Sequence, residues 1–298
     1  MSLALDLAPP MPSLRRRNRL RRTLGEAGSV MLGVVLLIWS LLPVYNLLLI
    51  ALDPEEGEIE FAGNLWPPEP SLEGFIDVVT QEARYLEEFW HQFGNSLHIG
   101  LLTTVLTVLI GSLASFAVSR LRLSKGSLLT NAALLTYAIP ASFLIVPYYR
   151  IMHSYGLFGG PWAVIAAQVT FATPFTLLIL QLYAKLIPFE FDDAARVDGA
   201  SAVQVYLRIY LPLMMPALAV VAIYALLLAW NDYLYQAVLL LPRNATVSVT
   251  QGQLLTDTDA PWNAMMAAAI IYALPPLAVL FALRRYVAAS LAMSGFEA

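Results

Sequence analysis

Six long apolar stretches occupy about half of this 298-residue chain, and they constrain its fold more than any other feature. A helix needs about 20 apolar residues to cross the roughly 30 Å hydrocarbon core of a bilayer, and each stretch is long enough. Only 13% of the residues are charged, whereas soluble domains carry about 25%. We therefore predict an all-α integral membrane protein. Its six transmembrane helices are expected at residues 29–52, 95–118, 128–151, 161–184, 211–238 and 264–287.

An arginine-rich segment, residues 1–28, precedes the first stretch, so a cleaved signal peptide is an alternative to a first span. The apolar run exceeds the about 7–15 residues of a signal-peptide core, and no small-residue cleavage site follows it. We predict an uncleaved span. The basic tail before it is expected to lie near anionic membrane lipid.

Lysines and arginines predict the orientation, because basic residues near spans are retained on the cytoplasmic side. Most of the 17 lie before the first span, between the second and third, between the fourth and fifth, or at the end of the sixth. The exceptions are Arg84, Arg150 and Arg243. We expect a six-helix domain at 29–290 between two cytoplasmic tails, 1–28 and 291–298.

Two segments on the opposite side are long enough to hold structure of their own. In the acidic segment 53–94, the amphipathic run Leu72–Phe93 predicts a short surface helix. Segment 241–263 is rich in threonine and valine, which predicts a short extended, hairpin-like loop rather than a helix.

Prolines interrupt the apolar stretches. Each removes a helix hydrogen bond, which a membrane tolerates where neighbouring helices or a wet cavity satisfy the freed carbonyl. They predict kinked spans around an internal path. They are Pro43, Pro140, Pro147, Pro174, Pro212, Pro216, Pro275 and Pro276.

The inventory of chemical motifs is small. There are no cysteines, and His91, His98 and His153 lack metal-ligand spacing. No P-loop or nucleophile elbow occurs, so we expect no catalytic residue, metal or nucleotide on this chain. An intramembrane enzyme with a serine dyad, or an assembly factor, is an alternative, since a dyad needs no fixed spacing.

A polar and aromatic cluster closes the fifth stretch. Ionisable residues at membrane depth are functional candidates, so the cluster is a candidate for a substrate path. A helix end that meets water explains it equally well. In the rival class, a proton-coupled secondary transporter, Asp232 would carry the proton. The cluster consists of Trp230, Asn231, Asp232, Tyr233 and Tyr235.

The segment between the fourth and fifth stretches, residues 185–211, contains four acids, two arginines and a run of small residues. A first short helix carries acids in its first turn, where the helix dipole favours them, and Gly199 supplies the turn after it. A second short helix starts at Ala202. The expected face of the first is Phe191, Ala194, Ala195 and Asp198, and that of the second is Val203, Tyr206, Leu207 and Tyr210. Amphipathicity alone favours a connector at the membrane interface.

The residue order in this segment adds a resemblance. Asp193-Ala194-Ala195, Gly199, Ile209 and Leu211-Pro212 stand at the spacing of the EAA motif, E-A-A-x3-G-x9-I-x-L-P, of ABC importer permeases. Asp193 replaces the usual glutamate. Residues 187–201 resemble the carbohydrate version of the motif, and residues 30–290 are similar to the smaller six-span permease of maltose-type importers.

This resemblance implies a type I ABC importer permease in a bacterial inner membrane. The chain would form half the pore for a di- or oligosaccharide and would couple to an ATPase through the loop at 185–211. The residues implied for this coupling are Glu190, Asp193, Ala194, Ala195, Asp198, Gly199, Ile209, Leu211 and Pro212.

The resemblance also implies the partners. They are a dimer of ATPase subunits that holds ATP and Mg²⁺, a second permease subunit and an extracytoplasmic solute-binding protein, with no nucleic acid among them. Gln251, Gly252 and Gln253 lie where a loop of maltose-type permeases enters the binding protein's cleft, although a plain connector is the alternative.

Overall fold

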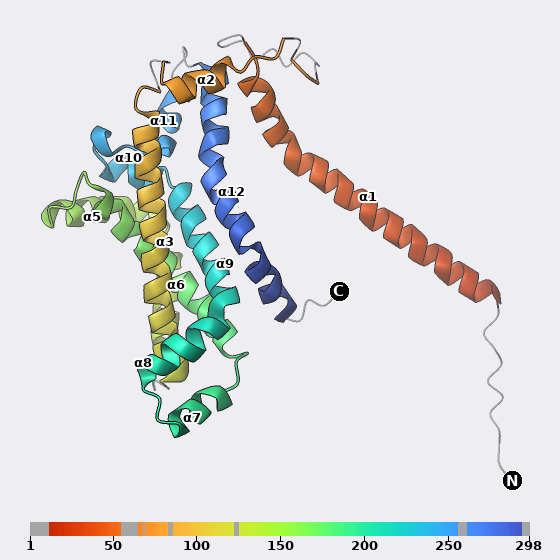
Figure 1. Ribbon diagram of the computed structural model, residues 1–298, viewed down its shortest axis with the longest axis vertical. Helices are drawn as coiled ribbons and strands as arrows, with labels where there is room; N and C mark the ends of the chain where they lie inside the picture. The colour runs from red at the N-terminus through yellow and green to blue at the C-terminus, as the bar shows by residue number, and fades with distance from the viewer. Residues whose placement is uncertain are drawn as a thin grey trace.

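The computed structural model describes residues 12–54, 65–67, 69–82, 86–121, 125–255 and 261–293. These residues are almost entirely helical, which confirms the predicted all-α class. Three helices, α3 (Phe89–Arg120), α6 (Pro161–Ala184) and α9 (Leu211–Trp230), pack on one another, and α12 (Trp262–Met293) packs on α9 (Figure 1).

Five described helices are long and apolar enough to cross a bilayer, and the number reaches six if one bent pair counts as a span. That pair replaces the predicted continuous span at 128–151. α4 (Gly126–Leu134) and the 3₁₀ turn η1 (Leu135–Ala138) stop before Pro140, and α5 (Ala141–Ser154) leaves at 101°. Ile139 is extended, as expected for a residue that precedes proline.

The first helix begins before the predicted span, and its apolar part at Gly25–Ala51 agrees with the predicted 29–52. α1 (Pro12–Ala51) continues through the arginine-rich segment from Pro12 onward, and residues 1–11 lie outside the described residues. It diverges from the other helices along most of its length (Figure 1). At its end, Ala51 packs with Ala264, Ala267 and Ala268 of α12.

The end of the bundle opposite α7 differs from two predictions. The amphipathic run from Leu72 forms α2 (Glu73–Thr80) and then breaks at Gln81, so it is shorter than expected. α2 packs on α12, and a Cβ at Gly74 would lie 2.8 Å from the backbone carbon of Asn263. The hairpin-like loop is wrong for the described part of 241–263, which holds η3 (Pro242–Asn244) and α11 (Val247–Leu254).

Tertiary contacts explain that second error. The Val247 backbone N–H at the start of α11 donates to Ser96 Oγ of α3 at 3.2 Å, and the Thr246 hydroxyl beside it donates to Gln236. These bonds favour a helical turn over the β preference of valine and threonine. Residues 256–260 of the predicted loop lie outside the described residues.

Close approach of α3 and α6 depends on glycine. A Cβ at Gly111 would lie 2.5 Å from Thr176 Cγ2. Small residues at such contacts let helix backbones approach in a membrane. The two helices therefore form a tight pair on which the segment at 185–211 is built.

Candidate functional site

The segment at residues 185–211, here called the elbow, projects from one end of the bundle (Figure 1). It contains α7 (Glu190–Val197), α8 (Ala202–Val205) and the π-helical turn η2 (Tyr206–Tyr210). Gly199 has φ +82°, a left-handed conformation that glycine adopts without strain, and it separates α7 from α8. The predicted helix, turn and second helix are confirmed.

Ser201 starts the second helix with a capping box. The Gln204 backbone N–H donates to Ser201 Oγ at 3.3 Å, and the Ser201 N–H donates to Gln204 Oε1 at 2.8 Å. Two free N–H groups at the helix start are thereby satisfied. The turn at Gly199 and the cap at Ser201 fix the direction in which α8 leaves α7.

Pro212 of the motif follows the π-helical turn. Proline has no N–H and its ring collides with the carbonyl four residues earlier in an α-helix. The Leu211 N–H instead donates five residues back, to the Tyr206 carbonyl. One extra residue in this turn accommodates the proline, so α8, η2 and α9 follow one another without a break. Ile209 and Leu211 are half-buried here, and Pro212 is exposed.

Two tyrosines of η2 attach the elbow to α3. Tyr206 and Tyr210 are buried, and their rings lie 5.2 and 5.1 Å from the Phe116 ring. The Tyr206 hydroxyl lies 2.8 Å from Ser112 Oγ, and the Tyr210 hydroxyl donates to Ser115 Oγ at 2.9 Å. Buried hydroxyls with partners avoid a desolvation penalty, so these contacts hold η2 against α3.

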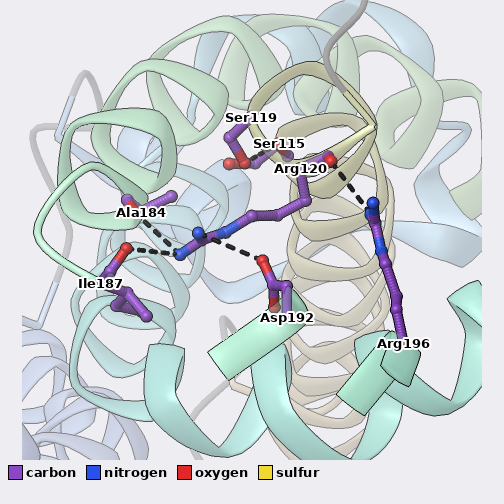
Figure 2. A network of polar contacts seen from close by, with 7 residues as sticks. All are labelled: Ser115, Ser119, Arg120, Ala184, Ile187, Asp192 and Arg196. Atoms are coloured by element: carbon purple, nitrogen blue, oxygen red, sulfur yellow. Dashed lines mark hydrogen bonds and ion pairs between the residues drawn. The ribbon is translucent and has the colours of Figure 1, made fainter. Parts of the chain in front are cut away.

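A buried ion pair connects α7 to the bundle. Figure 2 shows the Arg120 side chain at the end of α3 directed at Asp192 in the first turn of α7, with Nη1 and Oδ2 3.2 Å apart. Arg120 Nη2 donates to the carbonyls of Ala184 and Ile187, at 3.1 and 3.0 Å, at the end of α6. The guanidinium also lies over the Phe189 ring, 4.7 Å from its centre.

Arg120 therefore joins three helices. It neutralises Asp192 of α7 and satisfies carbonyls that the end of α6 leaves without helical partners. A second bond closes the network, because Arg196 Nη2 donates to the Arg120 carbonyl at 3.4 Å (Figure 2). Arg120 Nε and Nη1 have no hydrogen-bond partner among the described residues, so the side chain is held by the ion pair and by the two bonds from Nη2, and these contacts keep the three helices in one arrangement.

The burial of Asp192 corrects the predicted face of α7. Asp192 and the half-buried Ala195 face the bundle, whereas Phe191, Ala194 and Asp198 of the predicted face are exposed. On the second helix, Val203 and Leu207 are also exposed, and only the two tyrosines of that face are buried. The outward surface of the elbow thus combines acids with apolar side chains. It consists of Glu190, Phe191, Asp193, Ala194, Val197, Asp198, Gly199, Val203 and Leu207.

The sequence contains one local signal for this pair. Asp192 and Asp193 are consecutive in a helix, so their side chains point about 100° apart, and one can face the bundle while the other faces outward. Arg120 was counted only as a cytoplasmic charge, and nothing in its local sequence identifies the carboxylate that it contacts.

Two aromatic residues of the cluster at the far end of α9 are packed in the protein core. Trp230 is buried and stacks on Tyr272 with ring centres 4.6 Å apart, and Tyr235 is buried with its hydroxyl on the Ala141 carbonyl at 2.6 Å. Asn231 and Tyr233 are exposed. Of the predicted substrate-path residues, two are therefore core residues.

Asp232 is half-buried and already has partners. Its Oδ2 accepts from Gln168 Nε2 at 2.9 Å, and its Oδ1 accepts from the Tyr235 N–H at 3.2 Å. Gln168 Oε1 in turn accepts from Thr103 at 3.0 Å. The carboxylate thus joins α3, α6 and the start of α10 (Leu234–Leu239), which gives it a structural role.

The predicted binding-protein loop residues lie beside this cluster, on α11. A Cβ at Gly252 would lie 2.4 Å from the Tyr233 ring, so the two residues are in direct contact. Gln251 Nε2 donates to the Met265 carbonyl at 3.4 Å, and Gln253 is exposed. The structure brings Tyr233 and Gly252 together at the end opposite the elbow.

Comparison with known proteins gives a consistent result. Residues 107–293 match the model of a family described as "Binding-protein-dependent transport system inner membrane component". The chain is 32% identical to the inner membrane ABC transporter permease protein YcjP of Escherichia coli (strain K12), over 93% of this chain and 98% of that protein. It is 29% identical to the trehalose transport system permease protein SugB of Mycobacterium tuberculosis, over 85% and 91% of the two chains.

The fold has a solved counterpart. A chain from the crystal structure of a bacterial ABC transporter involved in the import of the acidic polysaccharide alginate superimposes with a TM-score of 0.71. The match covers 90% of this chain and 98% of that one, at 20% sequence identity.

Proposed function

This chain belongs to the family of binding-protein-dependent transport system inner membrane components, and on this premise we propose that it forms half the pore of a carbohydrate importer. It is a membrane-embedded permease subunit of an ABC importer and not an enzyme, because ATP hydrolysis in this family belongs to a separate subunit. Its partners are that ATPase, a second permease and a solute-binding protein. ATP and Mg²⁺ would be held by the ATPase.

The elbow is proposed as the docking element for the ATPase. The observation that carries this proposal is that α7 stands outside the bundle with Glu190, Asp193 and Ala194 facing outward, while Asp192 attaches it from within. The two acids would pair with basic residues at the edge of a groove on the ATPase, and the small alanine side chain would fit where that groove is narrow. Arg120 ends α3, Lys185 follows α6 and Arg208 is in η2, so all three lie at the elbow end of the bundle, which supports its placement on the cytoplasmic side.

A carbohydrate is the proposed substrate class. The trehalose permease named above supports it, as does the resemblance of residues 187–201 to the carbohydrate version of the motif. Family membership argues against the proton-coupled alternative, and Asp232 is held by Gln168 and Tyr235. Uptake in membrane vesicles should therefore stop with vanadate and continue with an uncoupler.

The test of docking uses one exposed position with two substitutions. Ala194→Asp adds a charge and bulk to the outward face of α7, whereas Ala194→Ser adds one hydroxyl at nearly the same volume. We expect Ala194→Asp to insert normally but to lose ATPase co-purification and uptake, and Ala194→Ser to retain both. Ala195 is a poorer choice, because it packs against the core cluster that contains Tyr206.

One outcome of the Ala194 experiment would contradict the docking proposal. If Ala194→Asp co-purified with the ATPase and imported sugar at the wild-type rate, α7 would not be the docking element. A panel of radiolabelled disaccharides and oligosaccharides, delivered by the cognate binding protein, tests the substrate class separately.

A further inference from the structure

The broken span at residues 135–141 lies at the middle of the membrane. The Tyr137 hydroxyl donates to the Phe171 carbonyl at 2.5 Å, and Phe171 is near the centre of α6, a helix that spans the bilayer by its length. Before the break, α4 follows the same helix from its other end, where Gln181 Nε2 donates to Thr130 Oγ1 at 2.6 Å. The interruption is therefore at mid-depth and not at the membrane surface.

The residues of this break are exposed. Every residue from Leu135 to Ala141 is exposed in the described chain, Ile139 and Pro140 are extended, and α5 begins without a side-chain cap. Irregular backbone at this depth does not occur in contact with lipid, because lipid tails cannot satisfy its N–H and C=O groups. The break must face water or protein in the assembled transporter.

Three aromatic side chains lie together beside the break. The Tyr137 and Tyr224 hydroxyls are 3.3 Å apart, and the Tyr224 ring centre is 4.6 Å from that of Phe175. Tyr137 is 48% exposed, and the other two are half-buried. Their rings offer apolar faces and their hydroxyls a polar edge, which matches a sugar ring with C–H faces and a rim of hydroxyls.

We propose that this break lines the water-filled translocation path and that Tyr137, together with Phe175 and Tyr224, contacts the sugar halfway across the membrane. The identity of the ligand rests on the proposed carbohydrate function, whereas the position of the path rests only on the geometry. Trp230 and Tyr235 of the aromatic cluster at the end of α9 are buried, so their rings are less accessible to a sugar than the Tyr137 ring.

A thiol placed at the break tests the position of the path. The chain has no cysteine, so Ala138→Cys gives it a single, small thiol that reports on this chain within the complete transporter. The control is Leu113→Cys, which replaces a side chain of similar exposure, 47% against 48% at Tyr137, on the continuous helix α3. Labelling by a charged, membrane-impermeant methanethiosulfonate is followed by the mass of this chain.

We expect Ala138→Cys to react at least about tenfold faster than Leu113→Cys, because the reactive thiolate forms only where water reaches the thiol. Saturating transported sugar, with its binding protein and ATP, should slow that reaction. If Ala138→Cys reacts as slowly as the control in every state, the break is covered by the second permease, and the placement of the path is overturned. Fast labelling that no transported solute slows overturns the sugar contact alone.

Substitutions of Tyr137 provide a second readout. Tyr137→Phe keeps the ring and removes the hydroxyl, whereas Tyr137→Ala removes both. A ring that contacts sugar predicts a several-fold rise in the KM for uptake with Tyr137→Ala and a smaller rise with Tyr137→Phe. Equal loss of maximal rate in both variants with no change in KM would indicate a structural role for the hydroxyl and would contradict the contact. Failure of the sugar panel would refute the substrate class without changing the labelling result.

Discussion

Removing the carboxylate of Asp192 is expected to release α7 from the bundle. Asp192→Ala leaves the Arg120 guanidinium buried without its ion partner, since the two side chains are only 5% and 1% exposed. Loss of one member of a buried pair costs about 3–5 kcal/mol, because the remaining charge is desolvated and uncompensated.

The structure favours the lower end of that range. Arg120 keeps its bonds to the Ala184 and Ile187 carbonyls and its contact with the Phe189 ring, so part of its charge remains stabilised. A cost of about 3 kcal/mol corresponds to a roughly 100-fold shift toward the released state of α7, at 1.4 kcal/mol for each factor of ten.

The neighbouring acid is a matched control. Asp193→Ala also removes a negative charge from the first turn of α7, with the same small effect on the helix dipole, but Asp193 is exposed. Hydrogen exchange of the α7 amides should increase by about two orders of magnitude in Asp192→Ala and change little in Asp193→Ala. Uptake should fall in both, through a loose elbow in the first and a weakened ATPase contact in the second.

The double variant Arg120→Met with Asp192→Leu completes the design. Replacing a whole buried pair by apolar residues is often neutral for stability, so α7 exchange should return toward wild type. Wild-type exchange in Asp192→Ala itself would refute the argument that this ion pair holds α7.

Three further predictions concern two glycines and one buried hydrogen bond. Gly199→Val should destabilise the elbow by about 1–2 kcal/mol, because the left-handed backbone strains a side chain there although nothing lies within 4 Å of an added Cβ. Gly199→Asn should destabilise it by less, because asparagine adopts this conformation more readily. Uptake by the two variants measures the difference. Gly111→Ala should lower the melting temperature through overpacking of about 1–3 kcal/mol, and Thr176→Ser, which removes the clashing methyl, should restore it. Tyr210→Phe should cost about 1 kcal/mol in thermal unfolding because Ser115 Oγ loses a buried donor, and an unchanged melting temperature would contradict the role assigned to that bond.

Local patterns account for the parts of the structure that were predicted correctly. The lengths of the apolar stretches determine the number and class of the helices, because bilayer thickness sets a requirement that a short window of sequence can meet. The elbow was also predictable, since its turn depends on Gly199 and its start on a helical spacing within a few residues.

Contacts between distant segments account for what was missed. Arg120 and Asp192 are adjacent only after α3 and α6 have packed, so neither local sequence identifies the other. Prolines alone did not indicate the broken span, because α5 continues past Pro147 and α6 past Pro174 without a break. The Ile139-Pro140 step differs in that the helix breaks there and the residues around it are exposed.

The uninterrupted helix from Ala202 to Trp230 limits where the fifth span can bend. At about 1.5 Å per residue its 29 residues extend roughly 43 Å, so a tilt of about 5° at the elbow displaces the far end by roughly 4 Å. That far end is Trp230, which stacks on Tyr272 of α12 and precedes the turn at Asp232. A small angular displacement at one face of the membrane is thus delivered to the opposite face as a shift comparable to the width of a water molecule.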